Sequence, residues 1–288
     1  MNDKKLYLQK IKQNFPNLKF SKSELITAGY DDDVIILDKK IVFSFPKNKL
    51  DCNKKFQKEL KILPFLNRAI TLPIPNYMYI PKDKSFAGYT YISGVPFVKK
   101  LFDKLNTREQ VASAKLVAKF LYELHSFSII KARKNGVTDA WTEQDARPYY
   151  IRRARAVFKQ LNYDFQSLQK LLSRYPMKDT ARFAVVHQDF TSDHILFDIK
   201  KKKIQGVIDF GDVQIADPAI DFSKLWDYGE EFLDLVLHYY KSNDPYLKER
   251  SLRWWIYHNI NLVEYGYDKK NEDMWKKGYT VLKELYGT

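Results

Sequence analysis

The sequence predicts an α+β protein with two lobes, a small strand-rich N-lobe and a larger, mostly helical C-lobe. Short strand patterns alternate with one long helical pattern in the first third of the chain. After Gly94 and Pro96, apolar residues recur mainly at helical spacing. The length of 288 residues also suits two lobes of ordinary domain size. We therefore expect an N-lobe over residues 1–91, a hinge near 88–95 and a C-lobe over residues 96–288.

The elements of the N-lobe follow from side-chain periodicity. An amphipathic pattern over residues 3–14 indicates a short helix. A second helix is expected over residues 53–67, where apolar residues recur at spacings of three and four. Runs rich in β-branched and aromatic residues predict strands at residues 23–28, 33–37, 40–45, 76–80 and 86–91.

Helical patterns dominate the C-lobe. The segment Thr107-Arg-Glu-Gln110 has the form of a capping box and starts a helix. A strand-rich insert is expected at residues 183–210, and Asp217-Pro218 has the form of an N-cap followed by Pro at the first helical position. Further helical stretches are expected over residues 146–174, 218–240, 245–266 and 270–286.

The composition favours a globular protein of a reducing compartment. Cys52 is the one cysteine, so no intrachain disulfide can form. No apolar run approaches the ~20 residues of a membrane helix, and the first residues interleave charged with apolar side chains, unlike a signal peptide. We expect a cytoplasmic monomer with no membrane partner.

The net charge of +14 raises the question of nucleic-acid binding. The basic residues are scattered through amphipathic helices, and the run at 200–203 lies between two strand patterns, where a solvated turn is expected. No RNP, zinc-finger or helix-turn-helix motif occurs. A lysine-rich soluble surface therefore explains the charge, and we expect no nucleic-acid partner.

One segment has a net charge of the opposite sign. Residues 187–234 contain eleven Asp or Glu against five Lys and no Arg, a net charge of −6 in a chain of +14. A fold does not need such charge asymmetry. The concentration of carboxylates therefore predicts a site for metal ions or for a cationic substrate.

A motif within this segment predicts the chemistry. His187-Gln-Asp189 is followed by His194 and then by Asp209-Phe-Gly. Protein kinases use His-x-Asp, an Asn five residues on, and Asp-Phe-Gly in the same order. Here His194 stands where the Asn is usual. The 20 residues between the two aspartates suit two short strands joined by a tight turn, which would bring both carboxylates to one place.

Each residue of the motif has an expected role. Asp189 would orient the attacking hydroxyl and accept its proton, while His194 and Asp209 would bind Mg²⁺, which needs few protein ligands because it keeps several waters. Imidazole is a poorer Mg²⁺ ligand than an amide oxygen, so a purely structural role is the alternative for His194. We expect His187 to be structural and to bond backbone carbonyls beneath the loop.

Three segments together resemble the aminoglycoside phosphotransferases, in particular the 2''-phosphotransferase branch. They are HQDFTSDHILFD (187–198), GVIDFGD (206–212) and ADPAIDF (216–222). The likeness extends to FAGYTYISGVP (86–96), FLYELHS (120–126) and VEYGY (263–267). It implies a protein-kinase-like fold, Mg²⁺, and transfer of the γ-phosphoryl group of ATP or GTP to a drug hydroxyl. In that branch a His also replaces the metal-binding Asn, which supports His194 as a ligand.

The resemblance also implies a set of nucleotide-binding residues in the N-lobe and hinge. They are Gly29, Ser44, Glu59, Thr90, Tyr91 and Ile92. The family normally has a Lys at the position of Ser44, where it grips the α- and β-phosphates. Lys47 or Lys49, in the loop after the strand, could fold back in its place. We expect the carboxylates of residues 31–33 to point outward, because they repel phosphate.

Acidic residues are the expected binding groups for the acceptor, since aminoglycosides are polycationic. By resemblance the substrate-binding residues are Asp212, Glu230, Glu231, Glu264 and Tyr267. A solvated helix face is the alternative for Glu231. Asp217 and Asp221 are expected to be structural, one as a helix cap and the other as a support for the catalytic loop.

These features predict an antibiotic kinase that phosphorylates an aminoglycoside hydroxyl and confers resistance. The segment around Trp226 has fewer acids than the branch, which leaves a macrolide or another small alcohol as an alternative acceptor. Ser44 leaves a third alternative, a catalytically weak, kinase-like binding protein. In each case the partner is a small molecule.

Overall fold

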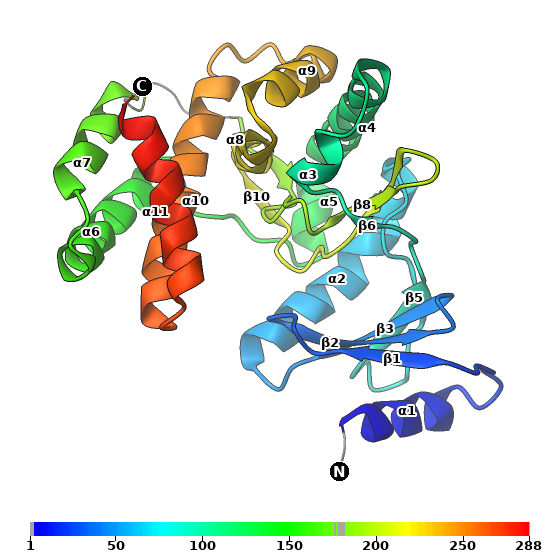
Figure 1. The fold of residues 1–288 in the computed structure, drawn as a ribbon. Helices are drawn as coiled ribbons and strands as arrows, with labels where there is room; N and C mark the ends of the chain where they lie inside the picture. Colours follow the sequence, from blue (N-terminus) through cyan, green and yellow to red (C-terminus); the bar gives the residue numbers. More distant parts are fainter. Residues whose placement is uncertain (1–2, 176, 178–181, 288) are drawn as a thin grey trace.

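The N-lobe is built on a five-stranded antiparallel sheet (Figure 1). The computed structural model describes residues 3–175, 177 and 182–287. In spatial order the strands are β1 (Ser23–Ile26), β2 (Asp32–Leu37), β3 (Ile41–Pro46), β5 (Ala87–Thr90) and β4 (Tyr77–Tyr79). Ser44 therefore lies on the central strand of the sheet, buried between its neighbours.

Two helices cover the two faces of this sheet (Figure 1). Helix α1 (Asp3–Asn14) packs through Ile11 on the face that carries Phe43. Gly88 of β5 is required there, because a Cβ at this position would lie 2.6 Å from the Phe43 ring. Helix α2 (Leu50–Ala69) lies on the opposite side, the side to which Ser44 points by the alternation of a strand.

The C-lobe contains two small sheets that position the motif. The strands β6 (Val95–Pro96), β8 (Ile195–Asp198) and β9 (Lys203–Val207) form one, and β7 (Ala184–Val186) pairs with β10 (Gln214–Ala216) in the other. Residues 187–194 link β7 to β8, and residues 208–213 link β9 to β10. The predicted strand-rich insert is confirmed, and both halves of the motif are loops between its strands.

Helices make up the rest of the C-lobe, so the predicted α+β two-lobe architecture is confirmed. They are α3 (Lys99–Phe102), α4 (Thr107–His125), α5 (Ile129–Lys134), α6 (Glu143–Leu161), α7 (Phe165–Arg174), α8 (Ala219–Ser223), the 3-10 helix η1 (Lys224–Tyr228), α9 (Glu230–Tyr240), α10 (Leu247–Asp268) and α11 (Glu272–Tyr286). The capping box of α4 lies one residue earlier than predicted, between Asn106 and Glu109. Among the helices of the described residues, none has the length and apolar character needed to cross a bilayer.

Two of the predicted helices were wrong in extent. The stretch 146–174 is two helices, because Asn162 adopts a left-handed φ of 56° and ends α6. The stretch 218–240 is three pieces, α8, η1 and α9, and Gly229 with a φ of 101° begins α9 at a new angle. Apolar periodicity continues through both breaks, so it could not reveal them.

Helix α10 is fixed by two buried arginines. Arg250 pairs with Asp217 at 2.8 Å, and Arg253 pairs with Glu143 at 2.6 Å. Asp217 also accepts a hydrogen bond from the backbone N–H of Ala219, although the N-cap position of α8 is Pro218 and not Asp217 as predicted. Each of these two buried arginines thus has a partner, as burial requires, and α10 is tied to α6 and to the segment just before α8.

Candidate active site

The catalytic loop is held by one buried carboxylate. Asp221 of α8 accepts hydrogen bonds from the backbone N–H groups of His187 at 2.8 Å and Gln188 at 2.9 Å. His125 Nε2 lies 3.0 Å from the same carboxylate. The expectation that Asp221 supports the loop is confirmed. Gln188 has a φ of 73°, a costly conformation for a non-glycine residue, and it directs the following Asp189 to a partly exposed position.

The ring of His187 lies beneath this loop, as predicted. Its Nε2 is 3.1 Å from the carbonyl oxygen of Ile208, next to Asp209. Burial lowers the pKa of His187, so the neutral imidazole is favoured. A neutral His187 therefore connects the two halves of the motif without adding charge to the site.

His194 and Asp209 face each other across the site. His194 Nδ1 lies 2.8 Å from the backbone carbonyl of Asp189, which can only accept, so Nδ1 carries the hydrogen. Nε2 faces Asp209 Oδ2, 3.3 Å away. The Asp209 backbone has a left-handed φ of 67°, which turns the carboxylate toward the imidazole.

These two groups fit a divalent metal ion. A neutral imidazole nitrogen and a carboxylate oxygen are both ligand types for such ions. Across residues 3–175, 177 and 182–287, no group of three or more His, Cys, Asp or Glu forms a complete metal cage. Mg²⁺ usually takes one or two carboxylates together with waters and substrate phosphates, so two protein ligands are sufficient.

Glu59 of α2 forms no ion pair with a basic side chain of the described residues. Its Oε1 accepts a hydrogen bond from the backbone N–H of Phe210 at 2.8 Å, and its Oε2 accepts one from the Tyr77 hydroxyl at 3.2 Å. Burial, with the nearby Asp209 and Asp32, raises the pKa of Glu59 to about 8. A lysine at position 44 would lower this pKa, and Ser44 does not.

A small pocket of about 140 Å³ lies between the sheet and the motif. Its walls include Gly29, Ser44 and Glu59 from the N-lobe and Asp209 from the C-lobe. The structure thus brings three predicted nucleotide-binding residues together with a predicted metal ligand. The volume is below the ~300 Å³ of common ligand pockets.

The carboxylates of residues 31–33 do not all point outward, contrary to expectation. Asp31 and Asp32 both line the pocket. Burial, with repulsion from Asp209, raises the pKa of Asp32 to about 7. The negative charge of Asp31 is compensated by Lys55 of α2, whose Nζ lies 2.7 Å from Asp31 Oδ2.

Neither Lys47 nor Lys49 folds back to replace the missing strand lysine. Lys47 Nζ donates to the carbonyl oxygens of Thr27, at 3.0 Å, and Gly29. Lys49 Nζ lies 4.5 Å from the ring centroid of Tyr30. Both lysines therefore hold the β1–β2 loop.

The hinge residues line a different pocket. Thr90, Tyr91 and Ile92 border a cavity of about 290 Å³ that also contains Gln205. The Tyr91 N–H is already used, since it donates to Lys40 O at 2.8 Å. The predicted nucleotide-binding set is therefore divided between two neighbouring sites.

Most of the predicted substrate carboxylates are paired with cations. Asp212 lies 2.8 Å from Lys55, and Glu230 lies 2.7 Å from Lys248. Glu231 is exposed, as on a solvated helix face.

Two predicted substrate residues lie on α10. Glu264 is buried, and its Oε2 is 3.3 Å from Arg153 of α6. Burial raises the pKa of Glu264 to about 7, although Arg153 opposes the rise. Tyr267 packs against Trp275, with ring centroids 6.2 Å apart. Within the described chain, neither residue bonds to Asp189 or to the metal-ligand pair.

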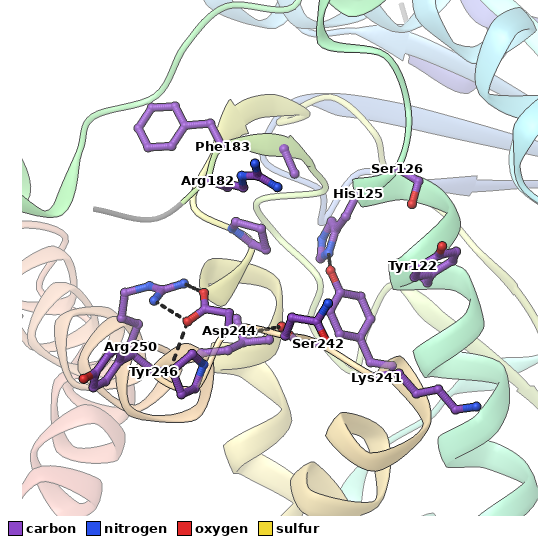
Figure 2. A pocket seen from close by; sticks show the side chains of 16 residues that line it. Tyr122, His125, Ser126, Arg182, Phe183, Lys241, Ser242, Asp244, Tyr246 and Arg250 are labelled. Carbon is purple, nitrogen blue, oxygen red and sulfur yellow. Dashed lines mark hydrogen bonds and ion pairs between the residues drawn. The ribbon is translucent and has the colours of Figure 1, made fainter. Parts of the chain in front are cut away.

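A pocket elsewhere in the C-lobe has about 600 Å³. Figure 2 shows His125, Arg182, Lys241 and Arg250 around it. None of the predicted catalytic, metal or nucleotide residues lines this pocket. Asp189, His194 and Asp209 lie together at the motif instead.

Two basic residues, Lys55 and Arg153, pair with predicted site residues but were not themselves predicted from the sequence. Lys55 lies four residues before Glu59 on a predicted helix, and residues four apart share a helix face, so periodicity could have identified it. Arg153 had no comparable signal, because its partner Asp268 is 115 residues away in the chain.

The supported loop, the paired imidazole and carboxylate, and the buried glutamate beneath a small sheet define a kinase-like phosphotransferase. A model of the phosphotransferase enzyme family matches residues 23–255, and the chain belongs to this family. The predicted enzyme class is confirmed.

Solved structures with similar folds agree with this assignment. One is APH(2'')-IIIa with GDP and kanamycin, at 24% identity and a TM-score of 0.84, covering 98% of each chain. A ternary complex of APH(2'')-IIa with streptomycin and ATP has 22% identity and a TM-score of 0.73, covering 99% of this chain and 97% of that one. A macrolide 2'-phosphotransferase from Brachybacterium faecium has 13% identity and a TM-score of 0.72, covering 96% of this chain and 97% of that one. The predicted protein-kinase-like fold is confirmed.

Proposed function

We propose that the protein transfers the γ-phosphoryl group of ATP or GTP to a hydroxyl group of an aminoglycoside and so confers resistance. The observation that carries this proposal is the convergence of Asp189 with the imidazole–carboxylate pair of His194 and Asp209. Related folds hold GDP with kanamycin, and ATP with streptomycin. The buried, free Cys52 suits a reducing compartment, and we place the activity in the cytoplasm.

The reaction assigns a task to each group. Asp189 orients the acceptor hydroxyl and takes its proton as the oxygen attacks the γ-phosphorus. The bond from that phosphorus to the β-phosphate oxygen breaks, and the nucleoside diphosphate leaves. His194 and Asp209 would hold Mg²⁺, which neutralises phosphate charge. Asp221 keeps the loop backbone in place during the transfer.

A second candidate acceptor is a macrolide or another small alcohol with fewer positive charges. The specific observation is that Lys55, Lys248 and Arg153 already neutralise acids that a polycation would use. Trp226 and Trp255 add a stacked aromatic surface, with ring centroids 5.9 Å apart. Ser44 also keeps a catalytically weak binding protein among the candidates.

Steady-state phosphate transfer separates these functions. The purified protein is incubated with MgCl₂, ATP or GTP, and one of kanamycin, gentamicin or erythromycin. Turnover with kanamycin or gentamicin but not erythromycin supports the aminoglycoside proposal, and turnover with erythromycin alone supports the second candidate. Nucleotide binding with no turnover on any acceptor would identify a binding protein.

The control for this assay is Asp189→Asn, which keeps the shape and removes the base. We expect a loss of at least about 100-fold in kcat, the usual range for a general base. A variant that retains full turnover would remove Asp189 from the mechanism.

A further inference from the structure

The nucleotide pocket lacks the cation that a triphosphate needs. Asp32, Glu59 and Asp209 line it, and the strand position that would supply a lysine is Ser44. The Glu59 carboxylate is bound by an amide and a phenol instead of by an ammonium group. A triphosphate entering these surroundings meets like charge, so a basic group must come from another element.

Lys55 lies where such a group is needed. It is one turn before Glu59 on α2, where side chains four residues apart are neighbours. Its Nζ is 2.7 Å from Asp31 Oδ2 and 2.8 Å from Asp212 Oδ1. Asp31 belongs to the loop that covers the pocket, and Asp212 follows the Asp209-Phe-Gly segment. The ammonium group thus bridges Asp31, which lines the pocket, and Asp212, three residues after the lining residue Asp209.

The other N-lobe lysines near the site are committed elsewhere. Lys47 and Lys49 hold the β1–β2 loop through carbonyl oxygens and the Tyr30 ring. Lys58 Nζ donates to the carbonyl oxygen of Val213 at 2.8 Å. Lys55, by contrast, is bound to two partly exposed carboxylates, which a phosphate can replace without leaving a buried group unpaired.

We propose that Lys55 takes the role of the missing strand lysine and binds the nucleotide phosphates, with Asp31 as the internal anion that the phosphate displaces. This inference rests on the proposed phosphotransfer function. It makes Asp31 and the incoming phosphate competitors for one ammonium group. Removing each partner should therefore change triphosphate affinity in opposite directions.

Calorimetry with the β,γ-imido analogues of ATP and GTP, in MgCl₂, tests this inference. Lys55→Ala should weaken binding by about tenfold to a hundredfold, the worth of a charge-assisted hydrogen bond. Adenosine and guanosine should bind as they do to the wild type, because they lack phosphates. Lys54→Ala is the matched control, since Lys54 is an exposed neighbour on the same helix, and it should bind like the wild type.

Two further variants make the test independent of any folding defect. Lys55→Ala combined with Ser44→Lys should recover most of the lost affinity, because the strand position then supplies the cation beside Glu59. Asp31→Asn alone should tighten triphosphate binding several-fold, because Lys55 loses a competing anion. A structural role for Lys55 predicts neither result.

The failures can be told apart. A wild type that binds neither analogue overturns the proposed function and, with it, the role of Lys55. If the wild type binds an analogue and Lys55→Ala binds it with the same affinity, only the role of Lys55 is overturned. Equal losses for nucleosides and triphosphates, or weaker binding by Asp31→Asn, would also overturn it.

Discussion

At the scale of single residues, the pocket between the sheet and the motif is lined by carboxyl groups that stabilise one another's protonated forms. Asp32 and Glu59 both have raised pKa values, first because they are buried and then because Asp209 is near. In an active kinase a strand lysine would oppose this effect. Ser44 supplies no such cation, so the raised pKa values of Asp32 and Glu59 remain.

The first prediction follows from the raised pKa of Asp32, about 7 in the folded protein against an ordinary value of 3.8. An acid whose folded pKa is raised binds more protons in the folded state, so stability falls as pH rises between these two values. Asp32→Asn removes this loss. The variant should be more stable than the wild type by on the order of 1–2 kcal/mol at pH 8, with an advantage that grows from about pH 4 and levels off above pH 7.

Thermal unfolding of the metal-free protein at several pH values measures this effect. Asp51→Asn is the control, because Asp51 is an exposed acid of α2, and its curve should follow the wild type. If Asp32→Asn has the wild-type pH dependence, the carboxylate does not titrate as its surroundings require.

At the scale of elements, the five-residue helix α8 supports the loop that carries Asp189. Asp221 is fully buried and receives two backbone N–H groups from the loop. His125 of α4 contacts the same carboxylate, and Tyr240 of α9 contacts the other ring nitrogen of His125 at 3.0 Å. Three helices therefore fix the backbone that carries Asp189.

The second prediction concerns this support. Asp221→Asn replaces one acceptor oxygen by an NH₂ group that faces N–H donors, so at least one loop amide loses its partner. We expect a loss of about 1–3 kcal/mol in the free energy of unfolding, the usual cost of leaving a buried donor without a partner, and a lower kcat at temperatures where the variant remains folded.

Chemical unfolding and steady-state kinetics check both parts. Asp227→Asn is the matched control, since Asp227 is an exposed acid that accepts a hydrogen bond from Trp255. It should lose much less stability. Wild-type stability in Asp221→Asn would mean that the loop is held by other contacts.

Some elements of the fold follow from local sequence patterns, and others depend on contacts between residues that are distant in the sequence. The strands, the position of α2 and the loops carrying Asp189 and Asp209 follow from local periodicity and a motif. The break at Gly229 does not, because apolar spacing continues across it. The Lys55 bridge joins residues 24 and 157 positions apart, so only the folded chain brings them together. The expectation that the carboxylates of residues 31–33 would all face outward was wrong for Asp31 for the same reason, because its partner Lys55 is distant in the sequence.

At the scale of the whole molecule, the β1–β2 loop joins the two lobes over the pocket. Asp31 reaches Asp212 of the C-lobe through Lys55. The adjacent Tyr30 contacts Tyr265 of α10, with ring centroids 6.4 Å apart. The pocket of about 140 Å³ beneath this loop is smaller than the ~300 Å³ of common ligand pockets, so we expect the loop to open when a ligand binds.

Cys52 provides a probe of that opening. It is the one cysteine of the chain, it is buried, and its Sγ lies 3.4 Å from Asp31 Oδ1 beneath the loop. Burial and the nearby Asp31 raise the pKa of the thiol, so modification is slow while the loop is closed.

Lys55→Ala removes an ion pair worth about 1 kcal/mol at a partly exposed site, which should increase the modification rate of Cys52 about fivefold. Release of the chromophore from a disulfide reagent measures the rate, with Lys54→Ala as the control. Raising the salt concentration should increase the rate in the wild type and have little effect in Lys55→Ala, because the screened ion pair is already absent there. Equal rates in all three proteins would mean that the loop opens without breaking the Asp31–Lys55 contact.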